Sequence, residues 1–181
     1  MSDSFLKIYG YYAKALWAFA ILAGILTFAI MLVVDANALT RKLFNWPLPA
    51  ALEITQALLV GAIMLPFAFT LFKREHVSTV FLTSRLPAGA RRWLHFFWAV
   101  VGGLLFAAVT YGTFEYAMRS LRMNEQIWGA TIQFAVWPAK MAVSVGTLLL
   151  TVQFLLDAIG VLLIPNFREH DEETAELHGN V

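Results

Sequence analysis

Few side chains in this sequence could carry chemistry inside a membrane, and Asp157 is the first of them. Proton and ion carriers need a titratable or coordinating group at membrane depth. None of the long apolar segments has a carboxylate, a histidine or a basic residue near its midpoint. The chain has no cysteine, which excludes disulfides, thiolate metal sites and thiol nucleophiles. The sequence therefore predicts no catalytic residue, no metal and no cofactor.

Asp157 stands within the last apolar segment, which starts near Pro138. About 19 residues separate the two, and at about 1.5 Å per residue they advance roughly 28 Å along a helix. That distance places the carboxylate close to the far interface of a bilayer. We predict a wetted helix end, with a polar contact to a neighbouring helix or a partner as the alternative.

Histidines could mark a second kind of chemistry, because membrane haem anchors hold haem between paired histidines. The four histidines border the loop between the second and third apolar segments or lie in the tail: His76, His95, His170 and His178. No pair faces another across the bilayer interior. The sequence therefore disfavours a haem site.

Four long apolar segments must position these side chains. A hydrocarbon core of roughly 30 Å takes about 20 helical residues to cross, and unpaired backbone groups in lipid are costly. Hydrophobic residues make up 60% of the chain and charged residues 14%. We predict an all-α integral membrane protein. It is a single membrane domain over 1–181, without room for a soluble catalytic domain, with spans at about 12–34, 51–72, 94–117 and 138–163.

The distribution of lysine and arginine predicts the orientation. With four spans, the N-terminus, the loop between spans two and three, and the tail share one side, which holds eight basic residues against five opposite. Both termini are therefore predicted to be cytoplasmic, with an acidic tail at 165–181. In that loop Val77, Val80 and Phe81 share one helical face and predict a short interfacial helix, with an irregular loop as the alternative.

Small residues four apart and one proline predict how the spans meet and bend. Pro66 lacks a backbone N–H and predicts a bend in span two around the carbonyl of Ala62. Pairs of small residues allow close helix contacts, and every span has one. The pairs are Ala20 with Gly24, Ala57 with Gly61, Gly103 with Ala107, Ala108 with Gly112, and Ala142 with Gly146.

Three segments carry the most specific pattern in the chain. They are Arg41 to Pro49 followed by Glu53, Lys73 to Val77, and Gln126 to Trp128 followed by Trp137, Pro138, Gly146 and Gln153. In this order and within a four-span frame, they resemble the small four-helix Q subunit of tripartite ATP-independent periplasmic (TRAP) transporters. The chain departs from that family at Ser78-Thr79-Val80, where a basic residue and an aspartate often stand.

The resemblance implies a subunit that carries no substrate itself and braces a large elevator-type membrane subunit. That subunit takes up an organic acid of the dicarboxylate or sialic acid class with sodium, after delivery by an extracytoplasmic binding protein. The resemblance further implies a multi-pass protein of the bacterial inner membrane. Its partners are the large subunit, the binding protein and membrane lipid, with no nucleic acid and no enzymatic activity.

The candidate partner contacts follow from the same segments. They are Arg41 and Glu53 at the outer rim, His76 at the inner rim, Trp128 and Trp137 in the last outer loop, and Asp157. Interface anchoring is the alternative for the tryptophans. Arg41 and Glu53 could also form an ion pair at the membrane boundary that fixes the loop against its helix or against a partner.

Two other functions stay open on the residues alone. One is a self-sufficient small homo-oligomeric carrier, for which Asp157 is the first residue to test. The other is a membrane anchor of a redox complex.

Overall fold

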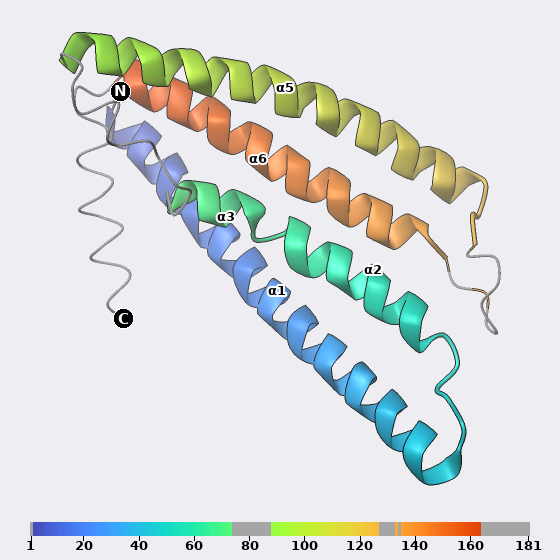
Figure 1. The fold of residues 1–181 in the computed structure, drawn as a ribbon. Coiled ribbons are helices and arrows are strands. Elements are labelled where there is room, and N and C mark those ends of the chain that lie inside the picture. Colours follow the sequence, from blue (N-terminus) through green and yellow to red (C-terminus); the bar gives the residue numbers. More distant parts are fainter. Residues whose placement is uncertain (1, 74–87, 127–132, 134, 164–181) are drawn as a thin grey trace, which may run out of the picture.

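The computed structural model describes residues 2–73, 88–126, 133 and 135–163. These ranges contain the helices α1 (Ser2–Phe44), α2 (Ala51–Met64), α3 (Phe67–Phe72), α5 (Ala88–Arg122) and α6 (Trp137–Leu163), shown in Figure 1. The predicted interfacial helix around residues 77–81 and the tail at 165–181 lie outside the described residues.

The first helix, α1, is much longer than a bilayer is thick. Its 43 residues extend about 65 Å at 1.5 Å per residue, against a hydrocarbon core of about 30 Å. The segment from Asp35 to Phe44 contains neither glycine nor proline, so nothing in it breaks the helix. The helix ends before Asn45, which has a left-handed backbone with φ of 52°, and Pro47 follows. α1 therefore continues beyond the predicted span 12–34 at both ends.

The second predicted span is interrupted at Pro66. α2 ends at Met64 and α3 begins at Phe67. The proline ring removes one backbone donor and crowds the preceding turn. Backbone bonding continues on both sides of the break, since Leu65 donates its N–H to the carbonyl of Gly61 at 3.1 Å and Thr70 donates to that of Pro66 at 3.0 Å. The predicted bend is confirmed and takes the form of two separate helices.

The helices lie in one layer and do not close into a compact bundle (Figure 1). α5 packs along α6, α6 packs on α2 and α3, and α1 packs on α2 and α3 from the other side. Both views show the α1–α2 pair diverging from the α5–α6 pair toward the ends where α1 and α5 finish. The core lies where α1, α3 and α6 meet, around the buried residues Leu16, Ala68 and Leu150.

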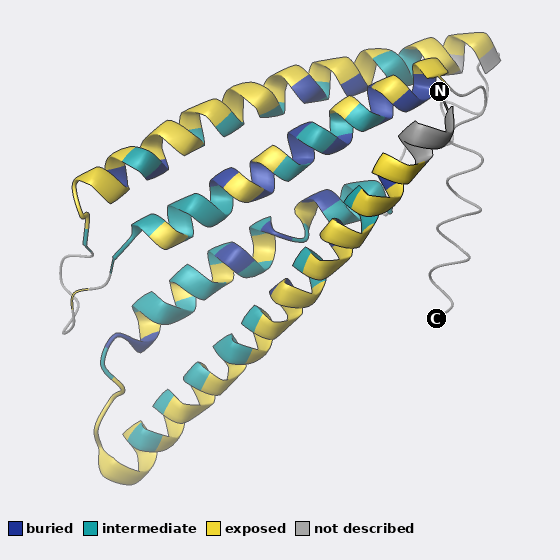
Figure 2. Ribbon diagram, turned by 180° about the vertical axis from the view of Figure 1, so that it is seen from behind, coloured by how far each residue is buried: buried dark blue, intermediate teal, exposed yellow. Residues whose placement is uncertain are grey.

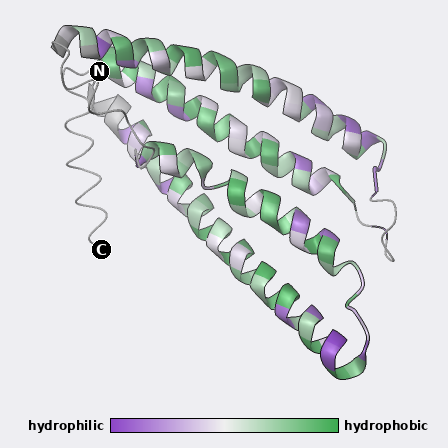
Figure 3. Ribbon diagram, in the orientation of Figure 1, coloured by the Kyte–Doolittle hydropathy of each residue, from purple (hydrophilic) through white to green (hydrophobic). Residues whose placement is uncertain are grey.

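Four helical stretches are long and apolar enough to cross a membrane: Lys7–Phe44, Ala51–Phe72, Arg92–Arg122 and Trp137–Leu163. α6 carries more buried residues than any other described helix, whereas α1 and α5 are exposed along much of their length (Figure 2). Figure 3 shows hydrophilic residues near the C-terminal ends of α1 and α5. The prediction of an all-α chain with four membrane-crossing helices is confirmed by length and composition. The cytoplasmic placement of both termini stays a prediction.

Candidate functional site

The polar side chains of α6 face into the layer. Ser144, Thr147, Thr151, Gln153 and Asp157 are all buried. Across the α5–α6 seam, the hydroxyl of Thr151 lies 3.2 Å from that of Thr110, and the hydroxyl of Thr147 lies 3.4 Å from that of Thr113. Such interhelical contacts hold helices together where lipid supplies no hydrophobic drive for association.

Asp157 is buried, with 7% of its surface exposed. The Nε2 of Gln153, which is 1% exposed, donates a hydrogen bond to Asp157 Oδ1 at 3.0 Å. Beside this turn, Tyr9 of α1 packs against Phe72 of α3 and Leu156 of α6. The prediction of a wetted helix end at Asp157 is wrong, because only 7% of its surface is exposed and α6 continues beyond it to Leu163.

A hydrogen bond joins α1 to α6 at the same end of the layer. The hydroxyl of Tyr12 donates to the carbonyl of Leu149 at 2.6 Å, which joins α1 directly to α6. One helical turn further along, Leu16 is fully buried against Ala68 and Leu150. These contacts set the rotation of α1 about its axis, so the residues on its opposite side face away from the layer.

The backbone of α6 comes close to that of α2 at Gly146. A Cβ atom at this position would lie 2.5 Å from the carbonyl oxygen of Met64 and 2.9 Å from its carbonyl carbon. Gly61 is tight as well, with Leu26 3.0 Å from the place of a Cβ. At Gly24 and Gly112, no described residue outside the glycine's own stretch of helix lies within 4 Å of the same place. The predicted close contacts therefore form at Gly61 and Gly146, and Gly103 lies in ordinary contact with α6, where a Cβ would be 3.6 Å from that of Phe154. Gly24 and Gly112 have no such neighbour among the described residues.

Arg92 of α5 reaches the C-terminal end of α6. Its Nε donates to the carbonyl of Val161 at 2.9 Å, and its Nη2 donates to that of Leu162 at 3.1 Å. The last carbonyls of a helix lack intrahelical donors and carry the negative end of its dipole. Sequence reasoning counted Arg92 only among the basic residues of the predicted cytoplasmic side. The structure gives it a role in joining two spans.

We expect Arg92→Gln to lower the free energy of unfolding by about 1 kcal/mol, because two hydrogen bonds from a charged donor are lost at a partly solvated site. Unfolding by SDS in mixed micelles, followed by circular dichroism, measures the change. Arg122→Gln is the matched control, since Arg122 is exposed in the last turn of the same helix. Equal losses from both variants would contradict a specific role for the Arg92 bonds.

At the other end of the α5–α6 pair, where α5 ends and α6 begins, an ion pair joins the two segments. The Nζ of Lys140 lies 2.5 Å from Oε2 of Glu125 and 3.9 Å from the ring centroid of Tyr116. The backbone N–H of Val136 also donates to the carbonyl of Glu125 at 3.1 Å. The bond from Lys140 favours the charged carboxylate and lowers the pKa of Glu125. These contacts hold the end of α5 next to the start of α6.

The predicted partner contacts are only partly placed by the structure. Arg41 is exposed in the last turn of α1, and Glu53 is half-buried in the first turn of α2. Within the described part of the chain, no ion pair joins these two side chains. Trp137 is half-buried as the first residue of α6. His76 and Trp128 lie outside the described residues, and a partner role for all six candidates stays a prediction.

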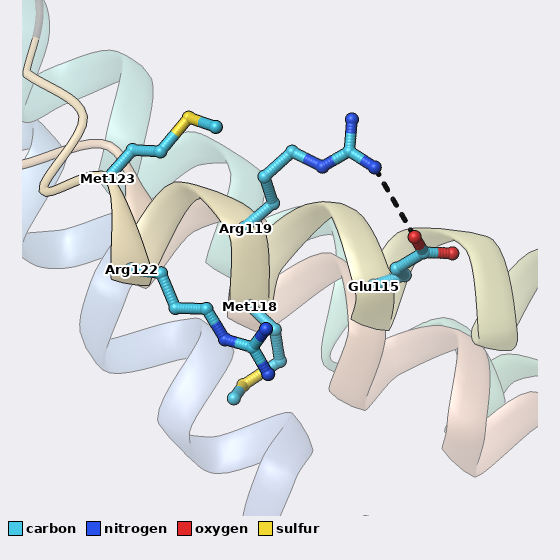
Figure 4. A pocket seen from close by; sticks show the side chains of 5 residues that line it. All are labelled: Glu115, Met118, Arg119, Arg122 and Met123. Carbon is cyan, nitrogen blue, oxygen red and sulfur yellow. Dashed lines mark hydrogen bonds and ion pairs between the residues drawn. The ribbon is translucent and has the colours of Figure 1, made fainter.

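A shallow charged hollow lies on the last turns of α5 (Figure 4). It is lined by Glu115, Met118, Arg119, Arg122 and Met123. Arg119 and Glu115 form an ion pair at 3.3 Å one turn apart, and both side chains are mostly exposed. Figure 4 shows Arg122 and Met118 on another side of the helix. An exposed pair of this kind contributes little to stability, and the hollow has none of the enclosure of a substrate site.

Together the fold and its contacts define a small multi-pass helical membrane protein that uses its buried polar groups to join its own helices. The family profile for the DctQ component of tripartite ATP-independent periplasmic transporters matches residues 30–163. The chain belongs to this family and is the small membrane subunit of a TRAP transporter. The resemblance seen in the loop segments is thereby confirmed. No curated protein matches the sequence.

Proposed function

We propose that this subunit braces a large elevator-type membrane subunit that carries the substrate. In TRAP systems the DctQ component works with DctM and a periplasmic binding protein. In this proposal sodium drives the uptake of an organic acid of the dicarboxylate or sialic acid class. The complex lies in the bacterial inner membrane, with both termini of this chain in the cytoplasm.

The family match over residues 30–163 carries this proposal, and the open layer supports it. A subunit against which a carrier moves must be broad and must keep its own shape. The partly buried hydrogen bonds of α6 to α5 and α1 join these helices through their facing sides. α1 and α5 expose large apolar side chains along their length, which a membrane partner or lipid can cover.

The rim residues are the candidate contacts with this partner. Glu53 is the most informative of them, because it is half-buried in the first turn of α2 and has no ion pair with Arg41 in the described part of the chain. A carboxylate at the membrane boundary gains from a charged or hydrogen-bonding partner. Trp137 at the start of α6, and by sequence Arg41, His76 and Trp128, complete the proposed set.

Affinity purification of the tagged chain from its native membrane in mild detergent tests the proposal. Mass spectrometry is expected to find a larger polytopic protein in stoichiometric amount. Proteoliposomes that contain this chain alone are expected to show no uptake of organic acids. Recovery of the chain alone, together with uptake by it, would establish the small-carrier alternative instead. If Glu53→Gln leaves both assembly and uptake unchanged, Glu53 is not a partner contact.

A further inference from the structure

A stripe of two lysines and a tyrosine runs along the outer side of α1 near its start. Lys7, Tyr11 and Lys14 follow one another at helical spacing, and all three are exposed, Tyr11 by 74%. The Nζ of Lys14 lies 5.9 Å from the ring centroid of Tyr11. The same side of the helix continues with exposed Ala18, Ile21 and Ile25. A cationic and aromatic end therefore leads directly into an apolar track.

This stripe faces away from the rest of the chain. Tyr12 is bonded to the carbonyl of Leu149, and Tyr9 and Leu16 are buried against α3 and α6. Tyr9, Tyr12 and Leu16 lie on one side of α1. Lys7, Tyr11 and Lys14 lie on the opposite side, because a helix turns by about 100° per residue. The stripe is thus held in a fixed direction by contacts on the other face.

The position of the stripe along α1 matches the headgroup layer of a bilayer. Lys14 immediately precedes the uncharged stretch that begins at Ala15. Lys7 lies about 10 Å further out at 1.5 Å per residue, near the outer edge of a headgroup region that is about 5–8 Å thick. Tyr11 lies between them, at the depth where amphipathic rings concentrate.

Among the residues whose side chains the structure describes, the two lysines are exposed cations at this end of the layer. Arg92 is bonded to the carbonyls at the end of α6, and Lys73 lies over the ring of Phe69 at 5.1 Å. Among the side chains that the structure describes, a nearby carboxylate, that of Asp157, is buried and accepts a hydrogen bond from Gln153. Neither Lys7 nor Lys14 has an ion pair with a residue whose side chain the structure describes, a set that begins at Lys7.

We propose that Lys7, Tyr11 and Lys14 bind the headgroup of an anionic phospholipid, whose acyl chain lies along Ala18, Ile21 and Ile25. The ammonium groups contact the phosphate, and the Tyr11 hydroxyl donates to it. Two lysines at fixed spacing favour a lipid with net negative charge over a zwitterionic one. All residues of this site come from the chain itself, so the site can be tested without the partner.

Trp17 reports on this site, because it is 61% exposed and lies three residues beyond Lys14. The full chain is placed in phosphatidylcholine bilayers containing either brominated phosphatidylglycerol or brominated phosphatidylcholine. The difference in fluorescence between the wild-type chain and Trp17→Phe isolates the Trp17 signal. Brominated phosphatidylglycerol is expected to quench Trp17 at a several-fold lower mole fraction than the zwitterionic lipid.

In Lys7→Gln/Lys14→Gln this preference should disappear, since each lysine near the surface contributes roughly a fivefold factor. Arg41→Gln/Lys42→Gln is the matched control, because it removes two charges from the exposed last turn of α1 and should leave the preference intact. Equal quenching by both lipids, or a preference that survives in Lys7→Gln/Lys14→Gln, would overturn the proposal. Inorganic phosphate should not reduce the preference, and competition by it would show that the ligand is free phosphate.

Discussion

Replacement of Gly146 by alanine is expected to lower the free energy of unfolding by about 1–3 kcal/mol, the usual cost of overpacking. The added Cβ would lie 2.5 Å from the carbonyl oxygen of Met64. That oxygen belongs to the backbone of α2, so relief requires the two helices to separate. Gly146→Leu should be worse and should also loosen α3, which continues span two after Pro66. Unfolding by SDS in mixed micelles, followed by circular dichroism, provides the measurement.

Gly112→Ala is the control for this prediction. Gly112 also lies within a long helix, but no described residue outside its own stretch of helix lies within 4 Å of the place of its Cβ. The same substitution there removes a flexible residue from a helix and should raise stability by about 0.5–1 kcal/mol. Opposite signs at Gly146 and Gly112 would identify close backbone approach as the cause. A loss of equal size at both positions would contradict the predicted contact between α6 and α2.

These two glycines also show where sequence reasoning stops. Gly112 and Gly146 each have an alanine four residues before them, so the spacing is identical in both helices. Only the structure shows that Gly146 faces Met64 while Gly112 faces outward. Lipid tails and side chains are about equally apolar, so the pattern that separates core from surface in a soluble helix is weak here. The four spans and the break at Pro66 depend on length and local chemistry, and these were predictable.

Asp157 illustrates the same limit for the polar groups. Counting residues along a helix gives a depth in the membrane, and the count put this carboxylate near an interface. Burial depends on which other helices pass that point, and α1 does so because it continues well before residue 12. Gln153 lies four residues before Asp157, a spacing at which helical side chains meet. This spacing indicates that the Asp157 carboxylate can accept a hydrogen bond from Gln153, which an estimate of membrane depth does not indicate.

The last prediction concerns what holds the layer together. Leu16→Ala should lower the free energy of unfolding by about 2–4 kcal/mol, because Leu16 is fully buried where α1, α3 and α6 meet. Leu32→Ala makes the same change on the same helix at a position 53% exposed, and it should change stability little. In lipid, a leucine on the outer surface has apolar neighbours whether or not the helices are associated. A buried leucine instead loses packing contacts that lipid replaces poorly when a cavity forms. If the two variants lost equal stability in SDS unfolding, helix packing at Leu16 would not be what holds α1 in the layer.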